Sequence, residues 1–317
     1  MLSKEATKTV AGHSPRQLAW RRFKSNRVAV PSLLAALIII SAVVFAPQVC
    51  ALLGISPDVR DAASIDSRGQ VIGDWGGISA KHPLGVVPGI GYDVLARLLY
   101  GAQISFLIAL MATIASVGAG LIFGMLSGYF RGRVDSVIGR YTDFLLAFPS
   151  FFMILALSAP MIQRIEMSGI ARNNDARILY LILILAFFGW PYLSRIIRSQ
   201  VLSLRERDFV LSARALGASN TRIIFKEILP NVWTPVIVYI SLTLPGYLTA
   251  EAVFSYLGIG VQPPTPTWGL LIADSTKFII NEPTYFFIPS LSLILVVLVF
   301  NLLGDAIRDA LDPKSES

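Results

Sequence analysis

The chain has 317 residues, of which 54% are hydrophobic and 15% are charged, and its formal net charge is +7. Soluble domains carry about 25% charged residues, so this composition indicates a membrane protein. The basic residues cluster beside apolar runs, which argues against a nucleic-acid-binding face and favours a topology signal. One cysteine and two isolated histidines offer neither an intrachain disulfide framework nor a metal site.

Six apolar segments predict an all-α membrane protein with six spans. A spanning helix needs about 20 mostly apolar residues, because a rise of about 1.5 Å per residue must cross about 30 Å of hydrocarbon. The predicted spans are 28–49, 104–130, 137–160, 178–197, 232–256 and 286–303. The first lacks a clear small-x-small cleavage site, so we expect a retained span. Prolines in the spans should bend them: Pro149, Pro191, Pro235, Pro245 and Pro289.

The distribution of basic residues predicts the orientation. With the N-terminus inside, most of the 27 lysines and arginines face the cytoplasm, as the positive-inside rule requires. Both termini and the polar loop 203–230 are then cytoplasmic. The chain divides into an N-terminal segment 1–27, a first span 28–49, an extracytoplasmic segment 50–103, a five-helix core 104–303 and a tail 304–317.

Two outer segments are predicted to consist mainly of turns. Segment 50–103 is rich in glycine and proline, with a short helix expected near 93–100. Segment 258–285 contains three prolines within Gln262–Trp268, which forbid a continuous helix there, and Trp268 suits a membrane interface.

Small and ionisable residues within the spans are candidates for packing or transport. Gly120, Gly124 and Gly128 lie on one helix face, where another helix can approach closely, either within the chain or from a partner subunit. Asp143 and Glu251 are costly in hydrocarbon and should face protein, water or the interface. Asp143 either pairs with Arg140 or lines a translocation path. Glu251 either lines such a path or pairs at the outer edge.

The loop 203–230 is predicted to form two short helices. Ser203 and Glu206 have the spacing of a capping box, and Phe209, Ala213 and Leu216 then form a narrow apolar stripe. Gly217 is expected to end the first helix in the left-handed conformation. Ser219 or Asn220 can cap a second helix that stops before Pro230. A polar island of this kind between spans indicates a docking site.

Several kinds of catalytic and transport chemistry are missing from the chain. There is no G-x-x-x-x-G-K-[ST] phosphate loop, no G-x-S-x-G elbow, no H-E-x-x-H pair and no carboxylate dyad. Nor is there an intramembrane relay of Asp, Glu and His, which weakens the case for a proton-driven transporter. We therefore expect a transport subunit that is not itself an enzyme and that takes its energy from a partner.

The motifs resemble those of a known family. Gly217 followed by Leu229 and Pro230 resembles the cytoplasmic "EAA" loop of binding-protein-dependent ABC importer permeases. Further stretches are similar to the C-type membrane subunit of dipeptide and oligopeptide importers: His82–Gly85, Arg97–Gly101, Gly128–Phe130, Ala213–Ser219, Leu257–Gly269, Asn301–Asp305 and Arg308–Pro313. One departure is Leu211-Ser212-Ala213, which stands where the family usually has Glu-Ala-Ala. Glu206 or Asp208 is the candidate replacement for the missing acid.

The resemblance implies a type I ABC importer permease in the cytoplasmic membrane that translocates peptides. It implies as partners a second six-span permease in a heterodimer, two cytoplasmic ATPases that use ATP and magnesium, an extracytoplasmic peptide-binding protein and the lipid bilayer. This chain would bind no cofactor. The residues expected to contact the ATPase, or to shape that contact, are Phe209, Leu211, Ser212, Ala213, Leu216, Gly217, Leu229 and Pro230.

Other functions remain open at this point. Nickel or another small solute is an alternative cargo, since related permeases share the same loop. A secondary transporter or channel would predict inverted repeats and midplane charges, and neither is evident in the sequence. A third alternative is a non-transporting scaffold or receptor, and the only feature of the sequence that favours it is the large outer segment 50–103.

Overall fold

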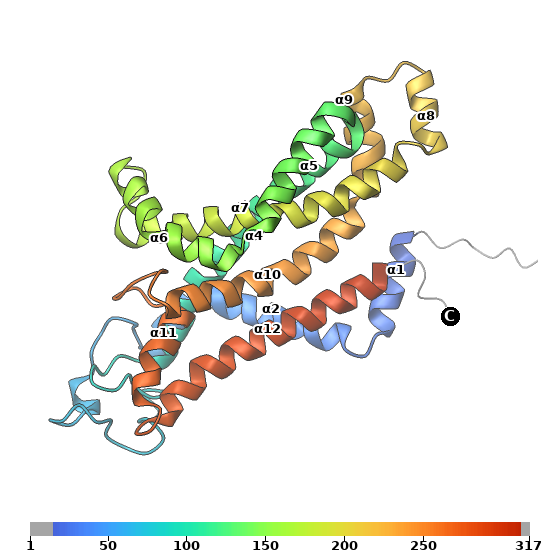
Figure 1. The fold of residues 1–317 in the computed structure, drawn as a ribbon. Coiled ribbons are helices and arrows are strands. Elements are labelled where there is room, and N and C mark those ends of the chain that lie inside the picture. Colours follow the sequence, from blue (N-terminus) through green and yellow to red (C-terminus); the bar gives the residue numbers. More distant parts are fainter. Residues whose placement is uncertain (1–14, 312–317) are drawn as a thin grey trace, which may run out of the picture.

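The computed structural model describes residues 15–311, which form a helical bundle without strands in that range (Figure 1). Four helices are each long and apolar enough to cross a membrane alone. These are α4 (Val94–Phe130), α7 (Asn173–Leu204), α10 (Trp233–Tyr256) and α12 (Pro283–Leu311). Residues 1–14, which include His13, and residues 312–317 lie outside the described residues. The predicted N-terminal segment 1–27 and tail 304–317 are therefore described only in part.

Two pairs of shorter helices raise the number of candidate spans in residues 15–311 to six. In the first pair, α1 (Pro15–Ser25) meets α2 (Ala29–Val44) at 91°. In the second, α5 (Gly132–Ala147) meets α6 (Ser150–Met167) at 89°. Counting each pair as one span confirms the prediction of an all-α protein with six spans.

The bend expected at Pro149 is confirmed, and it divides the predicted span 137–160 into two helices. Phe148 is extended, with φ −83° and ψ 138°, and Pro149 follows it. The proline ring disfavours the helical conformation of the residue before it, so α5 ends at Ala147. Prolines at 191, 245 and 289 lie inside helices that continue through them. Of these positions, only 149 divides a span.

Other boundaries also differ from the predicted ones. The first span stops at Val44, and a separate helix α3 (Ala46–Leu53) follows. The short helix expected near residue 93 is the first part of α4, which begins ten residues before the predicted start of its span. Asp93 caps this helix, since its side chain accepts a hydrogen bond of 2.7 Å from the backbone N–H of Ala96.

The α4–α7 pair forms the centre of the bundle. The side chains that would collide with a Cβ at Gly120, Gly124 and Gly128 are Leu193, Ile197 and Val201 of α7, at distances of 2.7–2.8 Å. A helix with any larger residue at these positions would have to move away, so the glycines set the closeness of the pair. The face of α4 that carries them is therefore filled by this chain's own α7.

Residues 54–92, here called the cap, lie at the end of the bundle opposite α8 and α9 (Figure 1). The cap is closed by turns and isolated bridges, one of which joins Arg60 to Tyr92. Beside it lies α11 (Trp268–Ser275), whose first turn is capped by Thr267. The side chain of Trp268 is buried, and its Nε1 donates to the Leu98 carbonyl at 2.9 Å, so it packs within the chain.

Candidate functional site

The segment that joins α7 to α10 begins later than predicted. Ser203 lies inside α7, which continues to Leu204, so the predicted capping box is wrong. Glu206 instead forms ion pairs with Arg131 and Arg205, whose nitrogens each lie 3.2 Å from Glu206 Oε1. Helix α8 (Asp208–Ala215) starts after Arg207, with no side-chain cap. Asp208 in its first turn has a charge that suits the positive end of the helix dipole.

The turn after α8 has the predicted chemistry. Gly217 has φ +76°, the left-handed conformation that glycine adopts without steric cost. The side chain of Ser219 then accepts a hydrogen bond from the N–H of Arg222 and caps α9 (Asn220–Arg222). The chain continues as a π-helical turn over Ile223–Ile228 and a 3-10 turn over Leu229–Asn231, which contains Pro230. This helix–turn–helix unit, residues 205–231, is here called the coupling loop.

The inner face of the coupling loop is anchored to the bundle. Val210, Ile223 and Ile228 are completely buried, in one apolar cluster with residues of α4 and α7. Burying each such side chain contributes about 1.5–3 kcal/mol. Val210 is not among the predicted site residues. Its neighbours Phe209 and Leu211 are also apolar, so no local alternation marks Val210 as the buried one. The anchoring makes the loop an extension of α4 and α7.

The outer face of the loop exposes large apolar side chains. Phe209 is 40% exposed, Leu216 88% and Phe225 61%. Leu211, at the position of the usual glutamate, is 42% exposed, and Ser212 beside it is also exposed. Ala213 and Leu229 are half-buried, while Pro230 is exposed. Such a patch on a polar loop is typical of a protein-binding surface.

Polar contacts join the coupling loop to the end of α4. The Tyr129 hydroxyl donates to Asn220 Oδ1 at 2.8 Å, and Arg205 Nη1 donates to the Tyr129 carbonyl at 2.5 Å. Arg131 forms the ion pair with Glu206. These residues are far apart in sequence, so no spacing pattern could reveal their contacts. The loop is thus tied to α4 by both polar and apolar contacts.

A polar cavity of about 510 Å³ lies between α4, α5 and α7. Asp135 and Arg198 meet in its wall through two hydrogen bonds of 2.5 and 2.7 Å. Asp143 also lines the cavity. Its ion partner is Arg195 of α7, not the predicted Arg140 of its own helix. The reason is that α7 packs beside α5, which brings Arg195 of α7 next to Asp143 of α5.

Glu251 lies inside the packed bundle, on α10. Its side chain is completely buried. Ser105 Oγ and Ser255 Oγ each donate to its carboxyl group at 2.6 Å, which ties α10 to α4. Buried carboxyl groups need such hydrogen bonds. Glu251 therefore pairs with two serine hydroxyls inside the bundle, and its place on a translocation path stays a prediction.

Residues 15–311 contain no group of three or more histidine, cysteine, aspartate or glutamate side chains placed to hold a metal ion. The cysteine at position 50 is buried and forms no disulfide. The coupling loop instead presents exposed apolar side chains on a buried base.

Comparisons with known proteins agree with this geometry. Residues 120–317 match the family "binding-protein-dependent transport system inner membrane component", and residues 14–57 match the "N-terminal TM domain of oligopeptide transport permease C". The chain is 39% identical to an oligopeptide transport system permease protein of Mycobacterium bovis, over 96% of each protein. It is 34% identical to a dipeptide transport system permease protein of Alkalihalophilus pseudofirmus, over 96% of this chain and 91% of that one.

Two further proteins extend the comparison. The chain is 33% identical to a glutathione transport system permease protein of Pectobacterium atrosepticum, over 94% of this chain and 91% of that one. Among solved structures, the inward-facing MetNI methionine ABC transporter is similar in fold, with a TM-score of 0.53 at 17% identity, over 68% of this chain and 96% of that one. The chain therefore belongs to the family of binding-protein-dependent transport system inner membrane components and is a multi-pass membrane protein.

Proposed function

We propose that this protein is the membrane-spanning permease subunit of an ABC importer that moves dipeptides or oligopeptides across the cytoplasmic membrane. Relatives that match more than nine-tenths of the chain are named as dipeptide, oligopeptide and glutathione permeases, and all of these cargoes are peptides. The motifs from His82 to Pro313 support the same assignment. The chain itself is a transport subunit, and ATP with magnesium is used by its partners.

The observation that carries the proposal is the two-sided construction of the coupling loop. Phe209, Leu216 and Phe225 point apolar surface outward, while Val210, Ile223 and Ile228 are buried against α4 and α7. Transmission of a partner's movement to the spans needs both features: a surface that contacts the partner and buried packing that joins the loop to the spans. The partner at this surface is a cytoplasmic ATPase, of which the assembly contains two. Leu211 adds to the apolar contact at the position where the EAA pattern has a glutamate.

The coupling loop defines the cytoplasmic side of the membrane. Both termini lie on that side, and the cap lies outside the membrane, where a peptide-binding protein would dock. A second six-span permease completes the pathway as a heterodimer. Asp143 and the polar cavity between α4, α5 and α7 then belong to the translocation path, because water and polar groups are tolerated in a membrane only inside such a cavity.

Coupled ATPase activity of the assembled importer tests this function. Phe209→Asp should leave membrane insertion intact and abolish peptide-stimulated ATP hydrolysis, since a charged group would enter the apolar contact. Trp20→Asp is a matched control, because Trp20 is 54% exposed but lies on α1, outside the coupling loop and the cap. Full peptide uptake by the Phe209 variant would refute the coupling role. Failure of the wild-type chain to co-purify with ATPase subunits would refute the importer assignment.

A further inference from the structure

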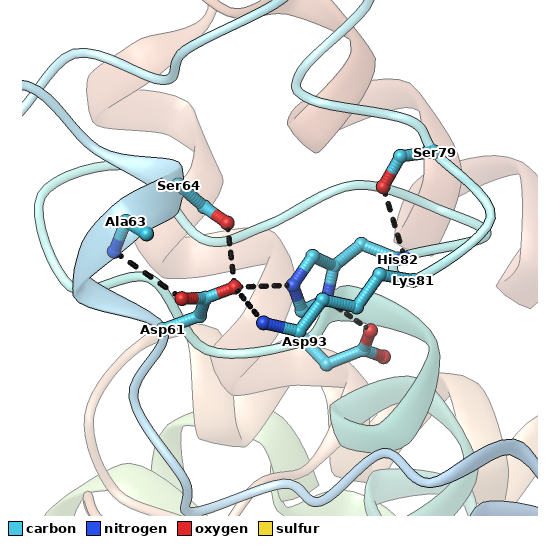
Figure 2. Close-up of polar contacts among 7 residues, drawn as sticks. All are labelled: Asp61, Ala63, Ser64, Ser79, Lys81, His82 and Asp93. Atoms are coloured by element: carbon cyan, nitrogen blue, oxygen red, sulfur yellow. Dashed lines mark hydrogen bonds and ion pairs between the residues drawn. The ribbon is translucent and has the colours of Figure 1, made fainter.

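His82 lies between two carboxylates that come from different parts of the chain (Figure 2). Its Nδ1 is 2.8 Å from Asp93 Oδ2, and its Nε2 is 3.0 Å from Asp61 Oδ2. Asp61 lies early in the cap, whereas Asp93 is the capping residue of α4. The ring is buried, and Asp93 is 2% exposed. A single side chain therefore bridges the cap and the start of a 37-residue helix.

The protonation of the ring follows from the geometry. A neutral imidazole has one N–H donor and one lone pair, while an ionised carboxylate only accepts. With two carboxylates at the two nitrogens, a neutral ring would direct a lone pair at one carboxylate. We propose that His82 is held as an imidazolium that clasps the cap to α4, and that loss of this proton loosens the attachment of the cap.

The surrounding charges support an imidazolium. Lys81 Nζ is 2.6 Å from Asp61 Oδ2, and Ser64 donates to the same oxygen at 2.9 Å. With His82 protonated, two cations and the two carboxylates of Asp61 and Asp93 balance. Without that proton, the cluster keeps one uncompensated negative charge, and this is costly because Asp93 and the ring of His82 are buried.

The remaining contacts hold the ring and its partners in place. The backbone N–H of His82 donates to Ser79 Oγ at 3.1 Å, which orients the residue from its own loop. Arg97, the nearest cation on α4, is engaged elsewhere and donates to the carbonyls of Pro57 and Pro264, each at 3.2 Å. Lys81 forms its ion pair with Asp61 alone. Among the contacts in residues 15–311, the charge that joins Asp61 to Asp93 is therefore that of His82.

The position of this clasp gives it a role in the movement of the protein. Helix α4 runs from Asp93 at the cap to Tyr129, which contacts Asn220 in the coupling loop. A cap fixed to the first turn of α4 moves with that helix as one body. His82 thus acts as a positioning residue that transmits motion between the cap and α4, and its effect is strongest while the ring is protonated.

The state of the ring can be observed directly, because the chain contains two histidines. The full-length chain is labelled with 15N-histidine and studied by solid-state NMR in lipid nanodiscs, with a His13→Gln variant to assign the signals. We expect both His82 ring nitrogens to be protonated near neutral pH. A neutral tautomer at that pH would overturn the proposal, even if the cap is well ordered.

A second measurement separates the charge from a merely structural role. Hydrogen exchange of the cap, corrected for intrinsic rates, should show protection that falls about 10-fold between about pH 6 and about pH 9. Asp93→Asn keeps the helix cap, and its amide can donate to the ring lone pair, so a neutral His82 still bridges both partners. Protection in this variant should be independent of pH. A flat wild-type profile, or a variant with the wild-type pH dependence, would refute the clasp.

Discussion

Replacement of Gly124 by alanine tests the closeness of the α4–α7 pair. The added Cβ would lie 2.7 Å from Ile197 Cβ and 2.7 Å from the Ser194 carbonyl oxygen. Favourable contacts of such atoms lie at about 3.5–4.0 Å, so the helices would have to separate by roughly 1 Å. Neither atom can rotate away, because one belongs to the backbone and the other is bonded directly to it. The clash therefore has to be relieved by moving whole helices.

The magnitude follows from two opposing effects. Overpacking of a tight contact costs about 1–3 kcal/mol, and the immobile contact atoms at Gly124 place this change at the upper end. Alanine is favoured over glycine in a helix by about 1 kcal/mol. We expect a net loss of about 2 kcal/mol in the free energy of unfolding, which changes the equilibrium constant by a factor of about 30.

Unfolding of the purified protein in mixed micelles, followed by circular dichroism, measures this change. Gly118→Ala is the matched control, because Gly118 lies on the same helix and a Cβ added there would have no heavy atom within 4 Å. The control should be at least as stable as the wild type, owing to its helix propensity. Equal stability of the two variants would refute the close packing of α4 on α7.

Three further changes address the loop, the cavity and the cap. Gly217→Ala should destabilise the coupling loop by about 1–2 kcal/mol through its left-handed backbone, measured as faster proteolysis of the loop with the spans intact. Asp135→Asn should leave the charge of Arg198 unpaired and reduce transport more than stability, and a normal uptake rate would contradict this expectation. Hydrogen bonds from Lys81 and His82 hold the pKa of Asp61 well below its usual range. The stabilisation from Asp61 is thus present above the ordinary carboxyl pKa and is lost as pH falls through the lowered one; Asp61→Asn should remove this acid dependence of hydrogen exchange in the cap.

Local patterns in the sequence were sufficient for much of the fold. Hydrophobic runs located the apolar spans, because their length is set by the bilayer, and Gly217 and Ser219 marked a turn and a cap whose requirements are local. The glycines at 120, 124 and 128 indicated a close helix contact, since their spacing places them on one face. A local pattern failed where the signal for a helix start lay inside a helix that had not yet ended. Ser203 and Glu206 have capping-box spacing, but the preceding helix simply continues through Ser203.

The sequence by itself determined the composition of the spans, the polar loop between them and the family motifs, since each depends on residues that are close together in the chain. The tertiary structure decided which partners those residues have. Asp143 pairs with Arg195, Glu251 is buried against Ser105, and His82 joins Asp61 to Asp93. These contacts depend on the packing of elements that are distant along the chain. The identity of a charged or hydroxyl residue therefore does not indicate which residue it will contact in the folded protein.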